Sequence, residues 1–314
     1  MESQLKTFYR WLNGRDVREI REKQVFNFIK HLYSIKSQFN KPLKQSSINS
    51  VTITIKSFFK YLYNSEYILT NPAEEIYVKK DTSGKEKRIF TVDEISAFLD
   101  VIPVDDEDAM RDRAYFELMY SSGLRAEELS NLELDSIYFD KRMIIIKLGK
   151  GKKDRYIPFS ETALKFLVRY VSVGRKYHLK NIHNENEKKY LFLSVKGKIK
   201  HSMISKRFKK YLKTCELDKK GFSLHSVRHT TATHLLEAGA SIRYVQELLG
   251  HEDIKTTQGY ARPSIENIKR IYKMYHPKEN ELYEEVTGEY LSRLRGLKEK
   301  SIKNYQKKKL CLKK

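Results

Sequence analysis

A polar, charged segment at residues 79–88, KKDTSGKEKR, separates two parts of the 314-residue chain. Segments that contain glycine and lack large apolar side chains are typical of exposed linkers between domains. Shortly before it, Asn71-Pro72 ends a helical pattern, because a proline disfavours helical backbone in the residue that precedes it. We therefore predict a small domain at residues 1–78, a linker at 79–88 and a second folded region that begins at residue 89.

The first part carries apolar residues at the spacing of amphipathic helices. They are Val25, Phe28, Ile29 and Leu32 in one segment, and Ile48, Val51, Ile55, Phe58, Phe59 and Leu62 in the next. The short stretch 51–55 also alternates as a strand does, but the helical period extends over more of the sequence. The pattern therefore predicts a small helical domain.

The second part begins with Thr91 and Glu94 at the spacing of a capping box, which marks the start of a helix. A longer helix follows, and Gly123 is expected to end it. The β-rich runs 143–148 and 155–158 flank a glycine- and lysine-rich turn, which predicts a hairpin. The rest of this part follows mostly helical patterns. We expect a chain that is mainly α with a small antiparallel β-sheet.

The charge of the chain predicts a polyanionic partner. The formal net charge is +22, the pI is about 9.6, and basic residues occur throughout the sequence. Composition does not separate DNA from RNA or from an anionic membrane, but no apolar run approaches the roughly 20 residues that span a bilayer. Cys215 and Cys311 offer neither a disulfide framework nor a Cys-x-x-Cys zinc site. We expect a cytoplasmic protein that binds nucleic acid and no membrane.

Several side chains are suited to cleaving a phosphodiester without a metal or cofactor. The transition state spreads negative charge over the non-bridging oxygens, and planar, permanently charged guanidinium groups bind those oxygens in pairs. A nucleophile must attack phosphorus, and an acid must protonate the departing oxygen. Two arginines, one or two histidines, a lysine and a hydroxyl therefore suffice. The chain offers Arg125, Lys150, His225, Arg228, His251 and Tyr260.

The local spacing of these candidates is compatible with a shared site. His225 and Arg228 are at positions i and i+3, so on a helix they share a face. Glu128 lies one helical turn after Arg125 and can orient its guanidinium. Lys150 is expected at the tip of the hairpin, from which a long side chain can reach across a DNA groove.

The same residues also have ordinary structural interpretations. A lysine-rich hairpin tip is usually a solvated turn, and Tyr260 is one of 21 tyrosines, so spacing alone favours a structural tyrosine. His225 and His229 lack the glutamate of a His-Glu-x-x-His zinc site, so we predict no metal. The acidic run 105–108 suits the N-terminal end of a helix, where carboxylates interact favourably with the helix dipole.

The order of these segments and their sequence motifs resemble those of the tyrosine recombinase (phage integrase) family, and most closely those of its Xer-like site-specific recombinases. That family carries an arginine in Gly-Leu-Arg-x-x-Glu-Leu, a hairpin lysine in Gly-Lys-Gly-x-Lys, a His-x-x-Arg helix, and Leu-Gly-His followed by the nucleophilic tyrosine. These positions hold Arg125 with Glu128, Lys150, His225 with Arg228, and His251 with Tyr260. The resemblance covers about residues 90–275. Lys152 and Lys153 compete with Lys150 in the hairpin, and the alignment with the family favours Lys150.

The resemblance implies a two-domain clamp around duplex DNA, with a helical core-binding (SAM-like) domain at 1–78 and a catalytic domain at 89–276. We expect no room for the additional N-terminal arm-binding domain of the lambda-type integrases, and so the simpler two-domain form. The resemblance also implies that the two arginines and two histidines bind the scissile phosphate, with Glu128 behind Arg125. Tyr260 would attack phosphorus to give a 3′-phosphotyrosine, and Lys150 would protonate the leaving 5′ oxygen.

The implied substrate is double-stranded DNA with specific recombination sites, in association with the nucleoid. The implied assembly is a homo-tetramer on two sites, or a hetero-tetramer with a related recombinase. Integration, excision and chromosome-dimer resolution all remain open, because the tail is longer than in Xer proteins. Two alternatives also remain, namely DNA relaxation like that of a type IB topoisomerase and a catalytically inactive architectural DNA-binding protein.

The tail at residues 277–314 is predicted to form a helix with a basic end. Its apolar residues follow one helical stripe: Leu282, Val286, Tyr290, Leu291 and Leu294. An amphipathic helix at a chain end must bury its stripe to be stable. The helix can fold back on its own domain, but the resemblance favours contact with a neighbouring subunit.

Overall fold

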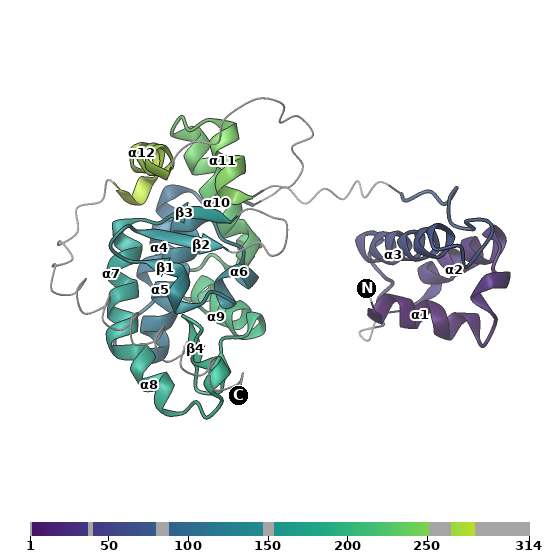
Figure 1. Cartoon of the computed structure of the whole chain (residues 1–314), viewed down its shortest axis with the longest axis horizontal. Coiled ribbons are helices and arrows are strands. Elements are labelled where there is room, and N and C mark those ends of the chain that lie inside the picture. The colour runs from purple at the N-terminus through teal and green to yellow at the C-terminus, as the bar shows by residue number, and fades with distance from the viewer. Residues whose placement is uncertain (1, 37–39, 80–87, 147–153, 251–264, 280–314) are drawn as a thin grey trace, which may run out of the picture. The chain divides into compact units, whose positions relative to one another are not determined.

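The computed structural model describes residues 2–36, 40–79, 88–146, 154–250 and 265–279 (Figure 1). The chain divides into two compact units, Met1–Glu86 and Lys87–Lys314. This division falls within the segment expected to be the linker. None of the helices in the described ranges has the length and apolar character needed to cross a membrane.

Unit 1 is helical in its described residues. Its elements are α1 (Glu2–Leu12), η1 (Val17–Glu19), α2 (Glu22–Ser34) and α3 (Gln45–Asn64). The rings of Phe8 and Phe28 meet edge to face with centroids 4.8 Å apart, and Phe59 packs on Phe8 at 5.8 Å. The helical interpretation of residues 51–55 is confirmed, because they lie inside α3 with Ile55 fully buried.

Unit 2 is also mainly helical. Its α-helices are α4 (Val92–Asp100), α5 (Glu107–Ser122), α6 (Ala126–Ser130), α7 (Glu161–Arg169), α8 (Arg175–Lys180), α9 (His201–Thr214), α10 (Leu224–Glu237), α11 (Ile242–Leu249) and α12 (Ile265–Tyr275). Short helical turns are η2 (Leu134–Ser136), η3 (Tyr170–Gly174), η4 (Glu185–Glu187), η5 (Asp218–Lys220) and η6 (Pro277–Glu279). The capping box at Thr91 and Glu94 is confirmed at the start of α4.

A small antiparallel sheet has the strand order β1 (Ile137–Tyr138), β2 (Met143–Ile146) and β3 (Arg155–Pro158). A second pair consists of β4 (Leu193–Ser194) and β5 (Gly197–Lys198). The predicted hairpin is therefore present, with Ile146 opposite Arg155 at its described end. The predicted turn with Lys150 lies outside the described residues. The expected fold class, mainly α with a small antiparallel sheet in a two-domain architecture, is confirmed.

Helix α5 is the central element of unit 2, since even its charged residues Arg111, Asp112 and Glu117 are fully buried. It ends as predicted at Gly123, whose φ of 63° is in the left-handed region. A Cβ atom at Gly123 would lie 2.7 Å from Leu249 Cδ2, so the glycine also permits α11 to approach the end of α5.

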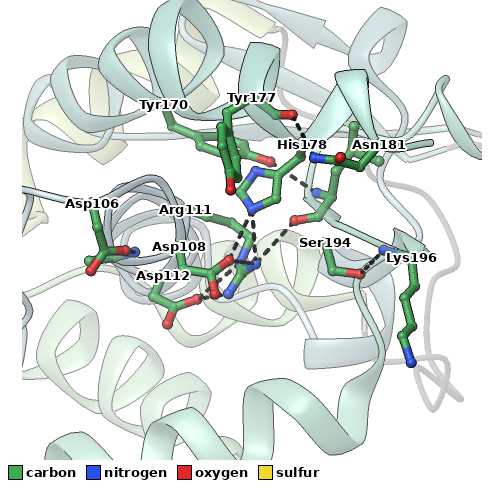
Figure 2. Close-up of polar contacts among 12 residues, drawn as sticks. Asp106, Asp108, Arg111, Asp112, Tyr170, Tyr177, His178, Asn181, Ser194 and Lys196 are labelled. Carbon is green, nitrogen blue, oxygen red and sulfur yellow. Dashed lines mark hydrogen bonds and ion pairs between the residues drawn. The ribbon is translucent and has the colours of Figure 1, made fainter.

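A polar network surrounds the start of α5 (Figure 2). Asp106 caps the helix by accepting a hydrogen bond from Ala109 N at 2.7 Å, as expected for the acidic run. Asp108 has a further role, because its carboxylate contacts Arg111 Nη1 at 2.5 Å and His178 Nε2 at 2.9 Å. Arg207 of α9 contacts the same carboxylate at 2.8 Å. The network therefore joins α5, α8 and α9.

The last described residues pack on unit 2. Tyr272 of α12 donates a hydrogen bond to Ser121 O at 2.8 Å, and the ring of His276 stacks on Tyr272. Glu279 pairs with Arg142 at 2.8 Å, and the Lys278 side chain is buried. The segment predicted as a subunit contact, 277–314, thus begins with residues that contact their own domain. Residues 280–314, with the predicted apolar stripe, lie outside the described residues.

Candidate active site

Three arginines converge on the carboxylate of Glu128. Arg125 is the residue that precedes α6, and Glu128 lies in the first turn of that helix. Arg155 begins β3, and Arg228 lies in the second turn of α10. The turn at Gly123 after α5, the sheet and α10 therefore bring together charged residues that are far apart in the sequence.

The expected orientation of Arg125 by Glu128 is present. Glu128 Oε2 accepts a hydrogen bond from Arg125 N at 2.8 Å, and Oε1 accepts one from Arg125 Nη1 at 3.1 Å. Glu128 thus caps α6 and holds the guanidinium at the same time. The Arg125 side chain remains 42% exposed, which leaves it accessible to a ligand from solvent.

Arg228 is buried and is held by two backbone carbonyls. Its Nη1 donates to Gly123 O at 2.7 Å and its Nη2 donates to Leu249 O at 2.6 Å, while Glu128 Oε2 lies 3.8 Å away. Burial, followed by repulsion from Arg125, lowers the pKa of Arg228 to about 10. The group therefore stays charged at neutral pH but has less favourable surroundings than a solvated arginine.

Arg155 was not identified from the sequence. Its Nη2 donates to Glu128 Oε1 at 3.2 Å and its Nη1 donates to Leu249 O at 2.7 Å. Burial lowers the pKa of Arg155, attraction to Glu128 opposes this change, and repulsion from Arg125 adds to it. The sequence did contain a signal for the burial of Arg155, because alternate residues of a strand lie on one face and Arg155 therefore shares a face with the apolar Ile157. The structure buries both residues on either side of exposed Tyr156.

His225 lies in the first turn of α10, as the His-x-x-Arg spacing predicted, but its side chain is exposed whereas that of Arg228 is buried. Its ring centroid is 6.5 Å from that of His229. The structure thus brings Arg125, Glu128 and Arg228 together and places His225 on the same helix as Arg228. The remaining predicted site residues, Lys150, His251 and Tyr260, lie outside the described residues.

The arginine cluster is suited to binding an anion. One carboxylate faces three guanidinium groups, and burial, with repulsion from Arg125 adding to it, lowers the pKa of both buried arginines. An anion with several oxygens would relieve this repulsion and accept bidentate hydrogen bonds. Among the described residues no group of His, Cys, Asp and Glu side chains is arranged to hold a metal ion.

Comparison with known proteins identifies the class of protein. Residues 88–267 match the phage integrase family, and residues 2–66 match the N-terminal SAM-like domain of phage integrases. The chain is 31% identical to tyrosine recombinase XerC 2 of Ralstonia nicotianae over 277 residues, which cover 87% of this chain and 78% of the relative. It is 34% identical to tyrosine recombinase XerD of Staphylococcus aureus over 236 residues, or 74% and 77% of the two chains.

Solved structures share the fold. XerH recombinase bound to a palindromic difH substrate, in a post-cleavage complex, aligns with a TM-score of 0.62 at 20% identity over 87% of this chain and 75% of that one. The Tn1549 transposon integrase in complex with circular intermediate DNA aligns with a TM-score of 0.55 at 20% identity, over 82% and 86% of the chains.

The chain belongs to the phage integrase family of tyrosine recombinases. It is a site-specific recombinase, and the comparisons do not favour a topoisomerase or an inactive architectural protein.

Proposed function

We propose that this recombinase cleaves and rejoins specific double-stranded DNA sites through a covalent 3′-phosphotyrosine at Tyr260. The observation that carries the proposal is the approach of Arg125 and Arg228 to one carboxylate, Glu128, with buried positive charge in excess. Guanidinium groups held in this way suit the non-bridging oxygens of a phosphodiester at its transition state.

In the proposed reaction Arg125 and Arg228 bind the scissile phosphate. Tyr260 gives its phenolic proton to solvent, and its oxygen forms a bond to phosphorus as the bond from phosphorus to the 5′ oxygen breaks. Lys150 supplies the proton that the departing oxygen takes up. The 5′ hydroxyl of a partner strand then gives its proton to Lys150 and attacks the phosphotyrosine. The bond from phosphorus to the Tyr260 oxygen breaks, and that oxygen takes up a proton from solvent, which regenerates Tyr260. Bond energy is conserved in the intermediate, so the scheme needs no ATP, cofactor or metal.

His225 and His251 complete the proposed site by hydrogen bonding to the phosphate. The exposure of the His225 side chain leaves it accessible to DNA. The roles of Lys150, His251 and Tyr260 rest on their sequence motifs. Glu128 acts behind Arg125 and holds its guanidinium.

Strand exchange would require four subunits on two DNA sites, as a homo-tetramer or with a related recombinase. Each subunit would enclose duplex DNA between a core-binding domain at 1–78 and a catalytic domain at 89–276 joined by the linker 79–88. The place of action would be the nucleoid. The formal charge of +22 supports attraction to the phosphate backbone, which weakens as salt concentration rises.

The direct test is Tyr260→Phe. We expect this variant to bind its site with nearly unchanged affinity and to form no covalent adduct with a nicked site, because the phenol oxygen is the nucleophile. A gel-shift titration measures binding, and denaturing electrophoresis detects the adduct. A covalent adduct formed by the variant would show that another residue attacks phosphorus.

A further inference from the structure

Arg155 connects the acceptors that hold the two phosphate-binding arginines. Glu128 Oε1 accepts from Arg125 Nη1 at 3.1 Å and from Arg155 Nη2 at 3.2 Å. Leu249 O accepts from Arg155 Nη1 at 2.7 Å and from Arg228 Nη2 at 2.6 Å. The two ends of one guanidinium group therefore join the carboxylate beside Arg125 to the carbonyl beside Arg228.

We propose that Arg155 is a positioning residue for DNA cleavage, one that sets the relative placement of Arg125 and Arg228 through Glu128 and the C-terminal carbonyl of α11. This inference rests on the proposed function. Arg155 is not assigned a contact with DNA, since its side chain is only 9% exposed. It acts on the reaction through the groups that bind the phosphate.

The planar guanidinium is required for this role. A lysine carries the same charge on a single nitrogen and cannot span the two acceptors with a fixed fork. Arg155 also stabilises the end of α11, because a cation next to the last carbonyls of a helix interacts favourably with the helix dipole. Loss of the fork would free Leu249 O and Glu128 Oε1 to shift independently of each other.

Gly250 is part of the same arrangement. It ends α11 with a φ of 68°, and a Cβ atom on it would lie 1.8 Å from Arg155 Nη1. Even one methyl group would therefore displace the guanidinium. Gly221 offers a matched comparison, because its φ is 71° but the nearest atom to an added Cβ is an Arg88 side-chain nitrogen at 3.5 Å.

The test compares Arg155→Lys and Arg155→Met with a control arginine. Arg175 of α8 is also buried and also donates to backbone carbonyls, those of Lys188, Tyr190 and Leu191, so Arg175→Lys removes comparable structural contacts elsewhere. Single-turnover formation of the covalent adduct is measured on a nicked half-site with an ordinary scissile phosphate. The same site is then prepared with a methylphosphonate, which lacks one charged non-bridging oxygen.

We expect both Arg155 variants to bind the half-site within a few-fold of the wild type and to cleave the phosphate about 10²-fold more slowly, as misplacement of catalytic groups by about 1 Å can do. Their defect should shrink on the methylphosphonate, because less charge has to be neutralised. Arg175→Lys should show the same small effect on both substrates. Gly250→Ala should reproduce the Arg155 defect, and Gly221→Ala should not.

An Arg155 defect of equal size on both substrates would indicate a purely structural role and overturn the proposal. So would cleavage of the phosphate at the wild-type rate by Arg155→Lys. These outcomes differ from a failure of the proposed function, in which the wild-type protein itself forms no adduct through Tyr260.

Discussion

At the scale of single residues, Glu128 organises the described part of the site. Its carboxylate caps α6, holds Arg125 and pairs with Arg155, so one side chain serves both the local fold and the site. The arginines differ in turn: Arg125 is accessible to solvent, whereas Arg228 is held by the carbonyls of Gly123 and Leu249. The structure thus offers one arginine that is partly exposed to solvent and one whose guanidinium is held by backbone carbonyls.

The division of labour between Lys150 and Arg228 can be tested with a better leaving group. A 5′-bridging phosphorothiolate departs without protonation, so it should largely restore cleavage by Lys150→Ala, whose defect on the ordinary phosphate should be about 10²-fold or more. It should not restore Arg228→Ala, which lacks stabilisation of transition-state charge. Rates of adduct formation on both substrates decide the matter. Equal rescue of both variants, or rescue of neither, would remove Lys150 from the role of acid and make Lys152 the next candidate.

At the scale of elements, α5 connects two polar clusters of different kinds. At its start, Asp108 links α5 to His178 of α8 (Figure 2). Asp108 also pairs with Arg207 of α9. At its end, Gly123 supplies the carbonyl that fixes Arg228. In the first cluster the charges are balanced, because the carboxylates of Asp108 and Asp112 pair with the guanidinium groups of Arg111 and Arg207. In the second cluster three arginines face one carboxylate, so positive charge is in excess. We therefore assign stability to the first cluster and anion binding to the second.

The first cluster predicts a dependence of stability on pH. The hydrogen bond from His178, followed by attraction to Arg111 and Arg207, lowers the pKa of Asp108 well below its usual range, although burial opposes this. A carboxylate with a depressed pKa in the folded state stabilises the fold above its unfolded pKa of about 3.9, and this stabilisation is lost as pH falls through the folded pKa.

Asp108→Asn should therefore lower the free energy of unfolding at pH 7 by about 1 kcal/mol, a modest value because the side chain is partly exposed to solvent. The difference from wild type should narrow below about pH 4. Urea unfolding across this pH range measures it. Asp105→Asn, an exposed member of the same acidic run, is the matched control. A constant difference between wild type and Asp108→Asn at every pH would contradict the electrostatic explanation.

At the scale of the whole molecule, the described C-terminal residues limit where a tail that contacts another subunit can begin. Tyr272, His276 and Glu279 all contact residues of their own domain. A truncation after Pro277 would remove the Arg142–Glu279 ion pair. A loss of cooperative binding could then come from weaker folding as well as from a lost subunit contact. The informative truncation is therefore after Glu279.

Removal of residues 280–314 should leave a folded protein that still binds a half-site, because the contacts of α12 and η6 remain. Cooperative binding to a full site and recombination should be lost if the predicted helix couples subunits. Half-site affinity should fall only modestly, since the basic end contributes salt-dependent attraction to phosphates. Gel-shift titrations on half and full sites, beside a recombination assay, test this. Unchanged cooperativity would mean that the tail packs on its own domain.

The sequence by itself determined the features that depend on neighbours along the chain. Helical periods located α2 and α3, the capping box at Thr91 located the start of α4, and Gly123 marked the end of α5. The motif around Arg125 predicted its contact with Glu128, because that contact lies within one helical turn. Helix caps and contacts such as that between Arg125 and Glu128 are formed by residues a few positions apart, so the local order of residue types predicts them.

Only the tertiary structure decided which distant groups meet. The partners of Arg155 are 27 and 94 positions away in the sequence, and the carbonyl that Arg228 contacts at Gly123 is 105 positions away. Every residue has a backbone carbonyl, so a sequence motif cannot indicate that the carbonyls of Gly123 and Leu249 accept these hydrogen bonds. The third arginine of the site was therefore missed, because its role arises from the packing of β3, α10 and the end of α11 around one carboxylate.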